Sequence, residues 1–283
     1  MLMSTNELFK KAYYGGYAIP AINTQGGNYD IISAICLAAE EQQSPIILAH
    51  YLATGQYSGH DWFYQTAKWM ADKVSVPVAI HLDHGDSYEN CMKMLQIGFN
   101  SIMYDGSNLD IEDNANRTQE IVKVCHSFGV PVEAEVGELI RLDAEGNAGK
   151  ISNIADPKQV RKFLNICSPD SLAVGIGNAH GYYAEVPDIR LDILEAIREF
   201  SSIPFVLHGC TGMDEDMIKK AISLGVVKIN FGTQIRYQYL KYLKEGMDTD
   251  IQGHSWKLSQ YAQQKLKNDV VDIIKLAGSD NKA

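Results

Sequence analysis

The chain has 283 residues, of which 46% are hydrophobic and 21% are charged, and its formal net charge is −10. A chain of this size can bury a large core in one domain spanning 1–283, and an acidic protein without a basic stripe is not a general binder of nucleic acid or of anionic membranes. No apolar run is long enough to span a membrane, and the polar N-terminal segment does not resemble a signal peptide. The five cysteines are scattered, odd in number and without CxxC spacing, which is typical of a reduced cytoplasmic protein.

Apolar runs alternate with amphipathic segments along the chain. The runs predict strands in 17–23, 45–50, 77–85, 101–106, 131–137, 171–177, 204–207 and 226–230. The amphipathic segments predict helices over 4–14, 29–42, 61–74, 88–97, 111–128, from 157, and over 190–200, 214–224, 233–244 and 255–277. This alternation with short connections predicts a (β/α)₈ TIM barrel with an additional C-terminal helix, and a doubly wound open sheet is the competing topology.

Three histidine–glycine pairs lie at or just past the ends of apolar runs, at His84, His180 and His208. A lone histidine at such a place is usually structural, but three with the same placement are harder to dismiss. In a barrel the carboxyl ends of the strands converge on one face, where chemistry is found. The polar residues predicted there are Asn23, Asp83, His84, Asp105, Glu135, His180, His208 and Asn230. The long segment 138–156 opens on the same face, so we expect it to act as a lid.

The residue types indicate metal chemistry. Three imidazoles from separate strand ends can surround one ion with an open position, which is the pattern of catalytic zinc. Asp83 adjoins His84 and either supports that ligand or transfers protons, although it could also cap the following helix. Lys228 is the one candidate for a Schiff base. It lies inside its predicted strand rather than at the carboxyl end, so a position lower in the barrel, away from the site, is the simpler interpretation. We therefore prefer a metal-stabilised enolate to an imine.

Glycines and small hydroxyls follow the last three predicted strands, at Gly181, at Gly209 to Gly212 and at Asn230 to Thr233. Exposed backbone N–H groups near helix starts bind phosphate, and this is the usual place for it in these barrels. Glycine turns alone are weak evidence, but beside a metal site they suggest a phosphorylated ligand. The residues by themselves thus indicate a zinc lyase that acts on a phosphorylated ketose.

A series of motifs resembles one known family in joint order and spacing, over nearly the whole chain. The family is the class II, zinc-dependent fructose-/tagatose-bisphosphate aldolases. The motifs are Leu82-Asp83-His84-Gly85, Tyr104-Asp105-Gly106-Ser107, Val132-Glu133-Ala134-Glu135-Val136-Gly137, Gly177-Asn178-Ala179-His180-Gly181, Leu207-His208-Gly209-Cys210-Thr211-Gly212 and Lys228-Ile229-Asn230.

The resemblance implies reversible aldol cleavage of a phosphorylated ketose to dihydroxyacetone phosphate and an aldehyde. It implies zinc held by His84, His180 and His208, and Asp83 as the proton-transfer group. It implies a second or alternative metal position near Asp105 and Glu135. It also implies a sodium ion near the phosphate, and substrate binding through Asn23, Gly181, Gly209, Thr211, Asn230 and Thr233.

Departures from the family pattern bear on the sugar. Ala184 stands where many relatives have lysine, and Gly232 stands where fructose-type members have aspartate. The lid acid maps only loosely, to Asp143 or Glu145. We therefore expect a tagatose-type bisphosphate rather than fructose bisphosphate, with a ketose 1-phosphate as runner-up.

Two other functions stay open. One is a sugar-phosphate isomerase or epimerase that uses the same enediolate chemistry. The other is a non-catalytic aldolase-like subunit, against which the presence of Asp83 and all three histidines speaks. Relatives are dimers or larger, so we expect a homodimer or homotetramer. The last helix adds apolar surface through Trp256, Tyr261, Leu266, Val270 and Ile274.

Overall fold

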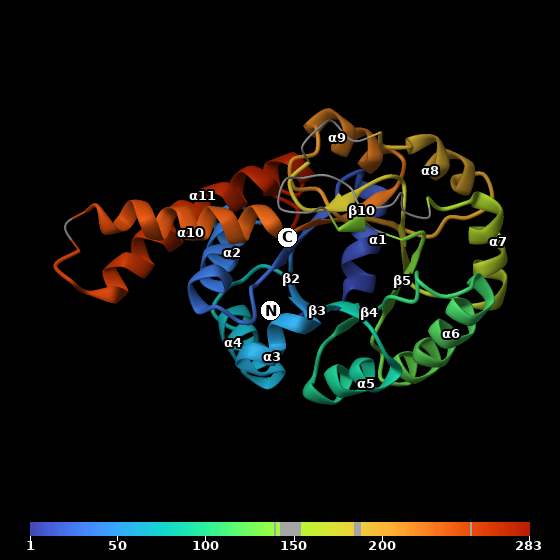
Figure 1. Ribbon diagram of the computed structural model, residues 1–283, viewed down its shortest axis with the longest axis horizontal. Helices are drawn as coiled ribbons and strands as arrows, with labels where there is room; N and C mark the ends of the chain where they lie inside the picture. The colour runs from blue at the N-terminus through green and yellow to red at the C-terminus, as the bar shows by residue number, and fades with distance from the viewer. Residues whose placement is uncertain (139, 142–153, 184–187, 250) are drawn as a thin grey trace.

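The computed structural model describes residues 1–138, 140–141, 154–183, 188–249 and 251–283. Its parallel strands close into a barrel in the order β1-β10-β9-β7-β5-β4-β3-β2 (Figure 1). The closed barrel confirms the predicted fold and excludes the open doubly wound sheet. The barrel strands are β1 Ile19–Asn23, β2 Ile46–Tyr51, β3 Val78–Gly85, β4 Ser101–Tyr104, β5 Val132–Val136, β7 Ser171–Val174, β9 Phe205–Leu207 and β10 Val226–Phe231.

The helices lie close to their predicted bounds. They are α1 Thr5–Gly15, α2 Tyr29–Glu41, α4 His60–Ala71, α5 Tyr88–Ile97, α6 Ile111–Ser127, α7 Pro157–Ile166, α8 Leu191–Arg198, α9 Glu215–Ser223, α10 Thr233–Met247 and α11 Ser255–Ala277. Four short elements have no counterpart in the prediction: η1 Leu52–Thr54, α3 Gly55–Ser58, β6 Ile140–Arg141 and β8 Ala179–His180. Strands β6 and β8 pair with each other outside the barrel.

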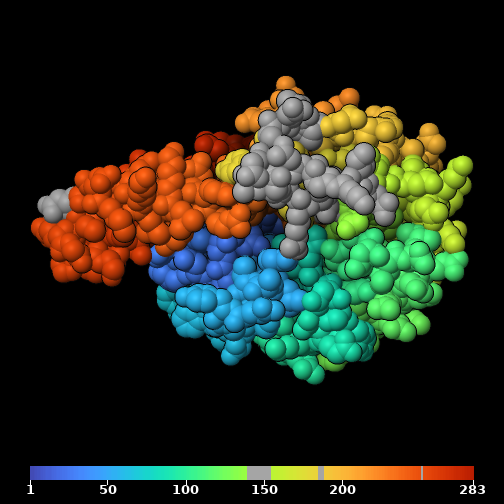
Figure 2. All heavy atoms as spheres, in the orientation of Figure 1, coloured from blue at the N-terminus to red at the C-terminus, as the bar shows by residue number. Residues whose placement is uncertain are grey.

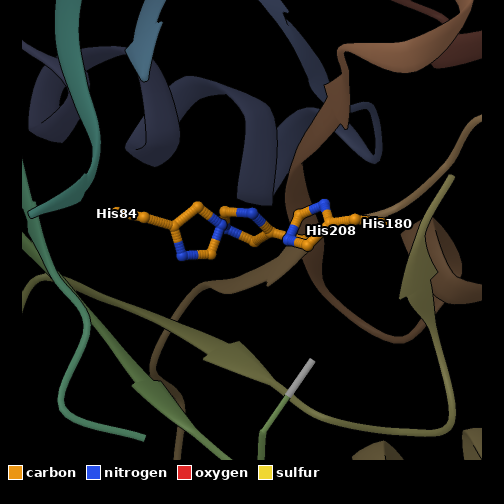
Figure 3. A group of neighbouring side chains, drawn as sticks. All are labelled: His84, His180 and His208. Carbon is orange, nitrogen blue, oxygen red and sulfur yellow. The ribbon is translucent and has the colours of Figure 1, made fainter. Parts of the chain in front are cut away.

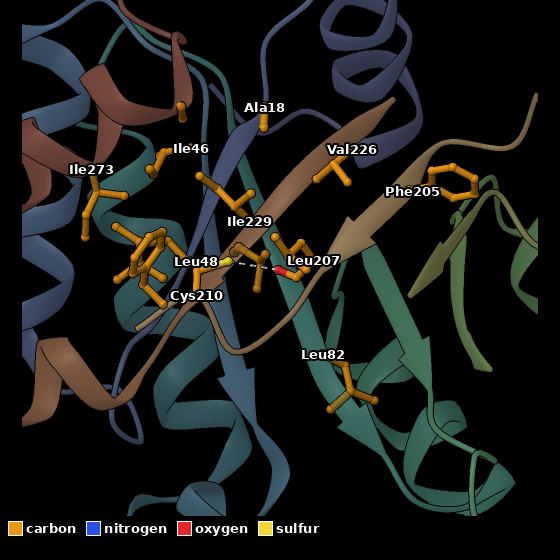
Figure 4. Packing of buried hydrophobic residues seen from close by; sticks show 14 of the residues in the cluster. Ala18, Ile46, Leu48, Leu82, Phe205, Leu207, Cys210, Val226, Ile229 and Ile273 are labelled. Carbon is orange, nitrogen blue, oxygen red and sulfur yellow. Dashed lines mark hydrogen bonds between the residues drawn. The ribbon is translucent and has the colours of Figure 1, made fainter. Parts of the chain in front are cut away.

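The apolar core has an outer and an inner part. Outside the barrel, side chains such as Leu82, Leu207 and Ile229 join one large cluster with the surrounding helices (Figure 4). Inside it, Leu8 and Phe9 of α1 pack against strand residues that include Val227. Because α1 fills the barrel with apolar side chains at that end, the polar residues gather toward the carboxyl ends of the strands, where the site lies.

Helices α10 and α11 form a hairpin that projects from the rounded body (Figures 1 and 2). Leu266, Val270 and Ile274 of α11 are fully buried within the chain. The prediction that they add surface for assembly is therefore wrong, whereas Trp256 at the start of α11 is 60% exposed. Among the described helices, none combines the length and the apolar character needed to cross a membrane.

Candidate metal centre and active site

A cavity of about 1000 Å³ opens at the carboxyl ends of the barrel strands. Every site residue predicted from the sequence lines it except His208, which is fully buried. The predicted residues on its wall are Asn23, Asp83, His84, Asp105, Glu135, His180, Gly181, Gly209, Thr211, Asn230 and Thr233. The strands therefore bring together residues that are far apart in the sequence, as the prediction required.

The three histidines meet at this cavity (Figure 3). His84 is the next-to-last residue of β3, His180 ends β8 and His208 follows β9. Each offers one ring nitrogen that lies within 4.8 Å of the other two. Their ring centroids are 4.8 to 6.1 Å apart. Such a set of nitrogen donors suits a divalent transition metal.

The end of β3 departs from regular strand geometry. Adjacent side chains of a strand normally point to opposite faces, yet Asp83 and His84 both line the cavity. His84 adopts a left-handed backbone with φ of 53°, and the pairing with β4 shifts register between Leu82 and Gly85. A non-glycine residue in this region is uncommon, and such strain gathers at functional sites. Because of this local change in backbone conformation, the neighbouring side chains of Asp83 and His84 both line the cavity.

Asp105 orients the His84 ring. Its Oδ2 lies 2.7 Å from His84 Nδ1, while its Oδ1 accepts hydrogen bonds from the backbone and hydroxyl of Ser107. His84 Nε2 is buried and has no hydrogen-bond partner among the described residues, as a metal-binding nitrogen requires. Burial lowers the pKa of His84, but the hydrogen bond with Asp105 and the charges of Asp83 and Glu135 outweigh it and raise the pKa to about 9.

His208 is held from its other side. Its Nε2 lies 2.9 Å from Glu133 Oε1, and its Nδ1 lies 3.1 Å from Asn230 Nδ2. Burial and the charge of Lys228 hold the pKa of His208 well below its usual value, so its imidazole is neutral. A neutral ring is the form that binds metal.

Backbone contact between two loops places His180 beside His208. Gly209 has φ of 69°, and a Cβ atom there would lie 2.2 Å from the carbonyl oxygen of Ala179. Only glycine allows this approach. The Tyr183 hydroxyl accepts a hydrogen bond from the Ala179 N–H and donates to the Gly209 carbonyl, each at 2.9 Å. This role of Tyr183 was not predicted from the sequence.

Asp83 is a buried carboxylate that points at the same centre. Its Oδ1 accepts a hydrogen bond from Asn230 Nδ2 at 3.2 Å and lies 3.9 Å from His208 Nδ1. Burial raises the pKa of Asp83, but the charges of His84 and Lys228 outweigh it, and the net direction is downward. Helix α5 is capped by the Ser87 side chain, so the alternative role of Asp83 as its cap is wrong.

The predicted phosphate-binding residues line the cavity, and one of them, Thr233, is the first residue of α10. The Thr211 hydroxyl accepts a hydrogen bond from the Gln234 backbone at 3.2 Å and thereby joins the loop after β9 to α10. Gly181, Gly209 and Thr233 line the same cavity. The first N–H groups of a helix attract anions, so the part of the cavity at the start of α10 suits a phosphate.

A Schiff base requires a lysine at the cavity. No lysine is among the described residues that line the cavity. Lys228 is fully buried lower in the barrel, where its Nζ pairs with Glu133 at 2.8 Å. This confirms that Lys228 is a residue of the barrel interior.

Other residues of the cavity were missed from the sequence. Arg117 of α6 lines it, and its charge opposes the rise in the pKa of the Tyr104 phenol that burial causes. Nothing in the sequence distinguishes Arg117 from a solvated arginine on a polar helix face. The predicted lid acids Asp143 and Glu145, and Ala184, lie outside the described residues.

A second possible group of metal ligands shares His84 with the first. His84, Asp105 and Glu135 offer ligand atoms that lie within 4.8 Å of one another. Both groups of ligands contain His84, and Asp105 of the second group contacts His84 Nδ1. The two groups are therefore alternative ways for the same imidazole to take part in metal binding.

The chain is similar to proteins named as aldolases. The model of the family "Fructose-bisphosphate aldolase class-II" matches residues 3–282. A fructose-bisphosphate aldolase of Mycoplasma pneumoniae is 36% identical over 298 residues that cover all of both chains. Among solved structures, the YdjI aldolase of Escherichia coli K12 has a TM-score of 0.87 and 33% identity, with full coverage of both chains. A putative fructose-1,6-bisphosphate aldolase of Coccidioides immitis has a TM-score of 0.86 and 27% identity, covering 98% of this chain and 96% of its own. The chain therefore belongs to the class II fructose-bisphosphate aldolase family, and it is an aldehyde-lyase that cleaves a sugar phosphate by aldol chemistry.

Proposed function

We propose that this aldolase cleaves a ketose 1,6-bisphosphate to dihydroxyacetone phosphate and an aldehyde, with a metal held by His84, His180 and His208. The observation that carries the proposal is the meeting of three imidazole nitrogens within 4.8 Å, next to the buried carboxylate of Asp83. The family is generally zinc-dependent, and the buried, unpartnered Nε2 of His84 fits a bound ion. Zinc supplies Lewis-acid polarisation of substrate oxygens when it is bound in such a site.

Asp83 is the proton-transfer group of this proposal. Its lowered pKa keeps it ionised at neutral pH, so it can accept the proton of the sugar hydroxyl whose carbon becomes the aldehyde. In the direction of condensation the same proton returns to the aldehyde oxygen. Asn230 fixes the carboxylate through the hydrogen bond from Nδ2 to Oδ1. Asp105 and Glu135 remain the proposed ligands of a second or alternative metal position.

The two ends of the substrate are assigned to opposite walls. The phosphate of the dihydroxyacetone half lies against Gly181, Gly209, Thr211 and Thr233, beside the helix start that follows β10. Strand β4 lies across the ring from β10, and Arg117 projects into the cavity from the helix after β4. A second anionic group at the far end of the sugar would therefore meet Arg117, which supports a bisphosphate.

Of the two hexulose bisphosphates we favour the tagatose type. Gly232 lines the cavity, and a Cβ atom there would meet only the Asn23 Cβ at 3.5 Å. The space that a fructose-type aspartate would fill is thus open. The relatives described above carry the fructose name, so the sugar needs a direct measurement.

The test compares kcat/KM for D-tagatose 1,6-bisphosphate, D-fructose 1,6-bisphosphate and the corresponding 1-phosphates. A tenfold preference for the fructose compound, about 1.4 kcal/mol, rejects the tagatose assignment. Arg117→Met should lower kcat/KM for bisphosphates by roughly tenfold and leave the 1-phosphates unchanged, since a hydrogen bond to a charged group contributes about 1.5–3 kcal/mol. Lys123→Met removes the same charge from α6 outside the cavity and should change neither. Equal losses for both substrate classes would contradict the role of Arg117.

We also propose that the chain acts as a homo-oligomer in the cytoplasm. The projecting hairpin of α10 and α11 exposes Leu240, Met247 and Trp256 by 58%, 65% and 60%. Exposed apolar groups that gather on one feature are typical of an interaction surface. The five cysteines are unpaired and buried, as is usual in a reducing compartment.

A further inference from the structure

A buried ion pair lies beneath the three histidines, and neither of its residues was among the site residues predicted from the sequence. Lys228 is 0% exposed and Glu133 is 2% exposed. Lys228 Nζ donates to both carboxylate oxygens of Glu133, at 3.0 and 2.8 Å. Glu133 Oε1 also lies 2.9 Å from His208 Nε2. The carboxylate therefore bridges the lysine and a proposed metal ligand.

Stability alone gives little reason for this pair. Two buried charges lose their hydration, and apolar residues of similar volume often serve a core equally well. A carboxylate behind a histidine ligand, in contrast, fixes the tautomer and the ring orientation of that ligand. Asp105 has this position behind His84, with 2.7 Å to Nδ1. Glu133 has the corresponding position behind His208.

The direction of each hydrogen bond follows from Lys228. An ammonium group has three donors and no acceptor, and its contacts are the two oxygens of Glu133 and His81 Nε2 at 3.2 Å. His81 Nε2 must accept, so His81 Nδ1 donates to Ser101 Oγ at 2.7 Å, and the Ser101 hydroxyl is left to donate to Thr5 Oγ1 at 2.9 Å. The chain of donors runs from the lysine to Thr5 at the start of α1, on the side of Lys228 away from Glu133.

On the other side, Glu133 can only accept. His208 Nε2 must therefore carry its proton, and His208 Nδ1 keeps its lone pair. Asn230 Nδ2, a donor, lies 3.1 Å from that Nδ1, which agrees with this tautomer. The unprotonated Nδ1 is then the atom that His208 offers to a metal.

We propose that Glu133, held by Lys228, is a positioning residue that fixes the tautomer and ring orientation of His208 for metal binding. The inference rests on the proposed metal site and names two residues that increase the affinity of that site for the metal. The alternative is that the ion pair is purely structural. In that case, removal of both charges together would leave metal binding unchanged.

The test compares two double variants that both lack the ion pair. In Glu133→Gln/Lys228→Met the amide oxygen still accepts from His208 Nε2, whereas in Glu133→Leu/Lys228→Met no acceptor remains. Both are uncharged at these positions, so neither leaves an unpaired buried charge, and thermal unfolding of the metal-free proteins compares their stability. Zinc Kd is measured by competition with a chromophoric chelator. We expect the leucine variant to bind zinc about 10–100-fold more weakly than the glutamine variant.

Ser101→Ala is the matched control. It breaks the same hydrogen-bonded chain on the far side of Lys228, and it should leave zinc affinity unchanged. Equal zinc affinities in the two double variants would overturn the inference.

A second measurement needs no variant. The ¹⁵N shifts of His208 in the metal-free wild-type protein should show a protonated Nε2 and an unprotonated Nδ1, and the opposite tautomer would overturn the inference. If the wild-type protein binds no divalent ion, the proposed metal site fails, and the tautomer still decides the role of Glu133.

Discussion

Replacement of Asp83 by asparagine separates proton transfer from metal binding. The carboxylate is 8% exposed and accepts one hydrogen bond from Asn230 Nδ2, at 3.2 Å. Asparagine has the same size and keeps an oxygen for that bond, but it cannot take or return a proton at neutral pH. Because a positioned acid–base group contributes about 10²–10⁴-fold, we expect kcat to fall by this factor. At 1.36 kcal/mol per decade the loss corresponds to about 2.7–5.4 kcal/mol of transition-state stabilisation.

The assay couples release of dihydroxyacetone phosphate to its reduction, with metal content determined on the same samples. Asp83→Asn should keep the metal, and the free energy of unfolding should change by about 1 kcal/mol or less, since the hydrogen bond to Asn230 is retained. Asp86→Asn is the control, because Asp86 is a second carboxylate on the same cavity wall and has its hydrogen bonds with Ser87 and Asn90. Turnover by Asp83→Asn at the rate of the control would refute proton transfer by Asp83, and joint loss of metal and activity would make Asp83 a residue of the metal site.

Three further outcomes are expected. His84→Ala should lose bound metal and activity together, as measured by metal content per chain. Burial lowers the pKa of His50 to about 3, so the unfolded chain binds more protons between pH 3 and the ordinary value of about 6.5, and stability rises with pH across that window. His50 alone should therefore lower the free energy of unfolding by about 2 kcal/mol between pH 7 and pH 5, and His50→Gln should flatten this pH dependence. Sedimentation at micromolar concentration should show an oligomer that Met247→Glu/Trp256→Glu dissociates, and a wild-type monomer would contradict the assembly.

The barrel could be predicted because its signals are local. Each buried strand is a short apolar run, and most of the helices between them are amphipathic, so alternation alone gave the order of elements. The site followed from topology: in parallel strands the carboxyl ends meet, and residues such as Asn23, Asp105 and Asn230 each stand at one of those ends. Their shared cavity confirms that reasoning.

Features that depend on contacts between distant segments could not be predicted. The left-handed backbone of His84 arises where β3 changes register against β4, and the sequence of β3 contains no sign of it. Glu133 and Lys228 meet across the barrel interior, so neither segment alone indicates an ion pair. The apolar residues of α11 were assigned to an interface because their true partners lie elsewhere in the chain, in the large cluster around the barrel. The sodium ion near the phosphate stays a prediction.

The central claim is that cleavage depends on a metal at the three histidines. The most direct measurement removes divalent ions with a chelator, follows cleavage of the hexulose bisphosphates, and then restores zinc or cobalt while bound metal per chain is counted. We predict loss of cleavage on chelation and recovery that saturates at one tightly bound ion per chain. Undiminished cleavage by the metal-free protein, or borohydride trapping of the substrate on a lysine, would contradict it.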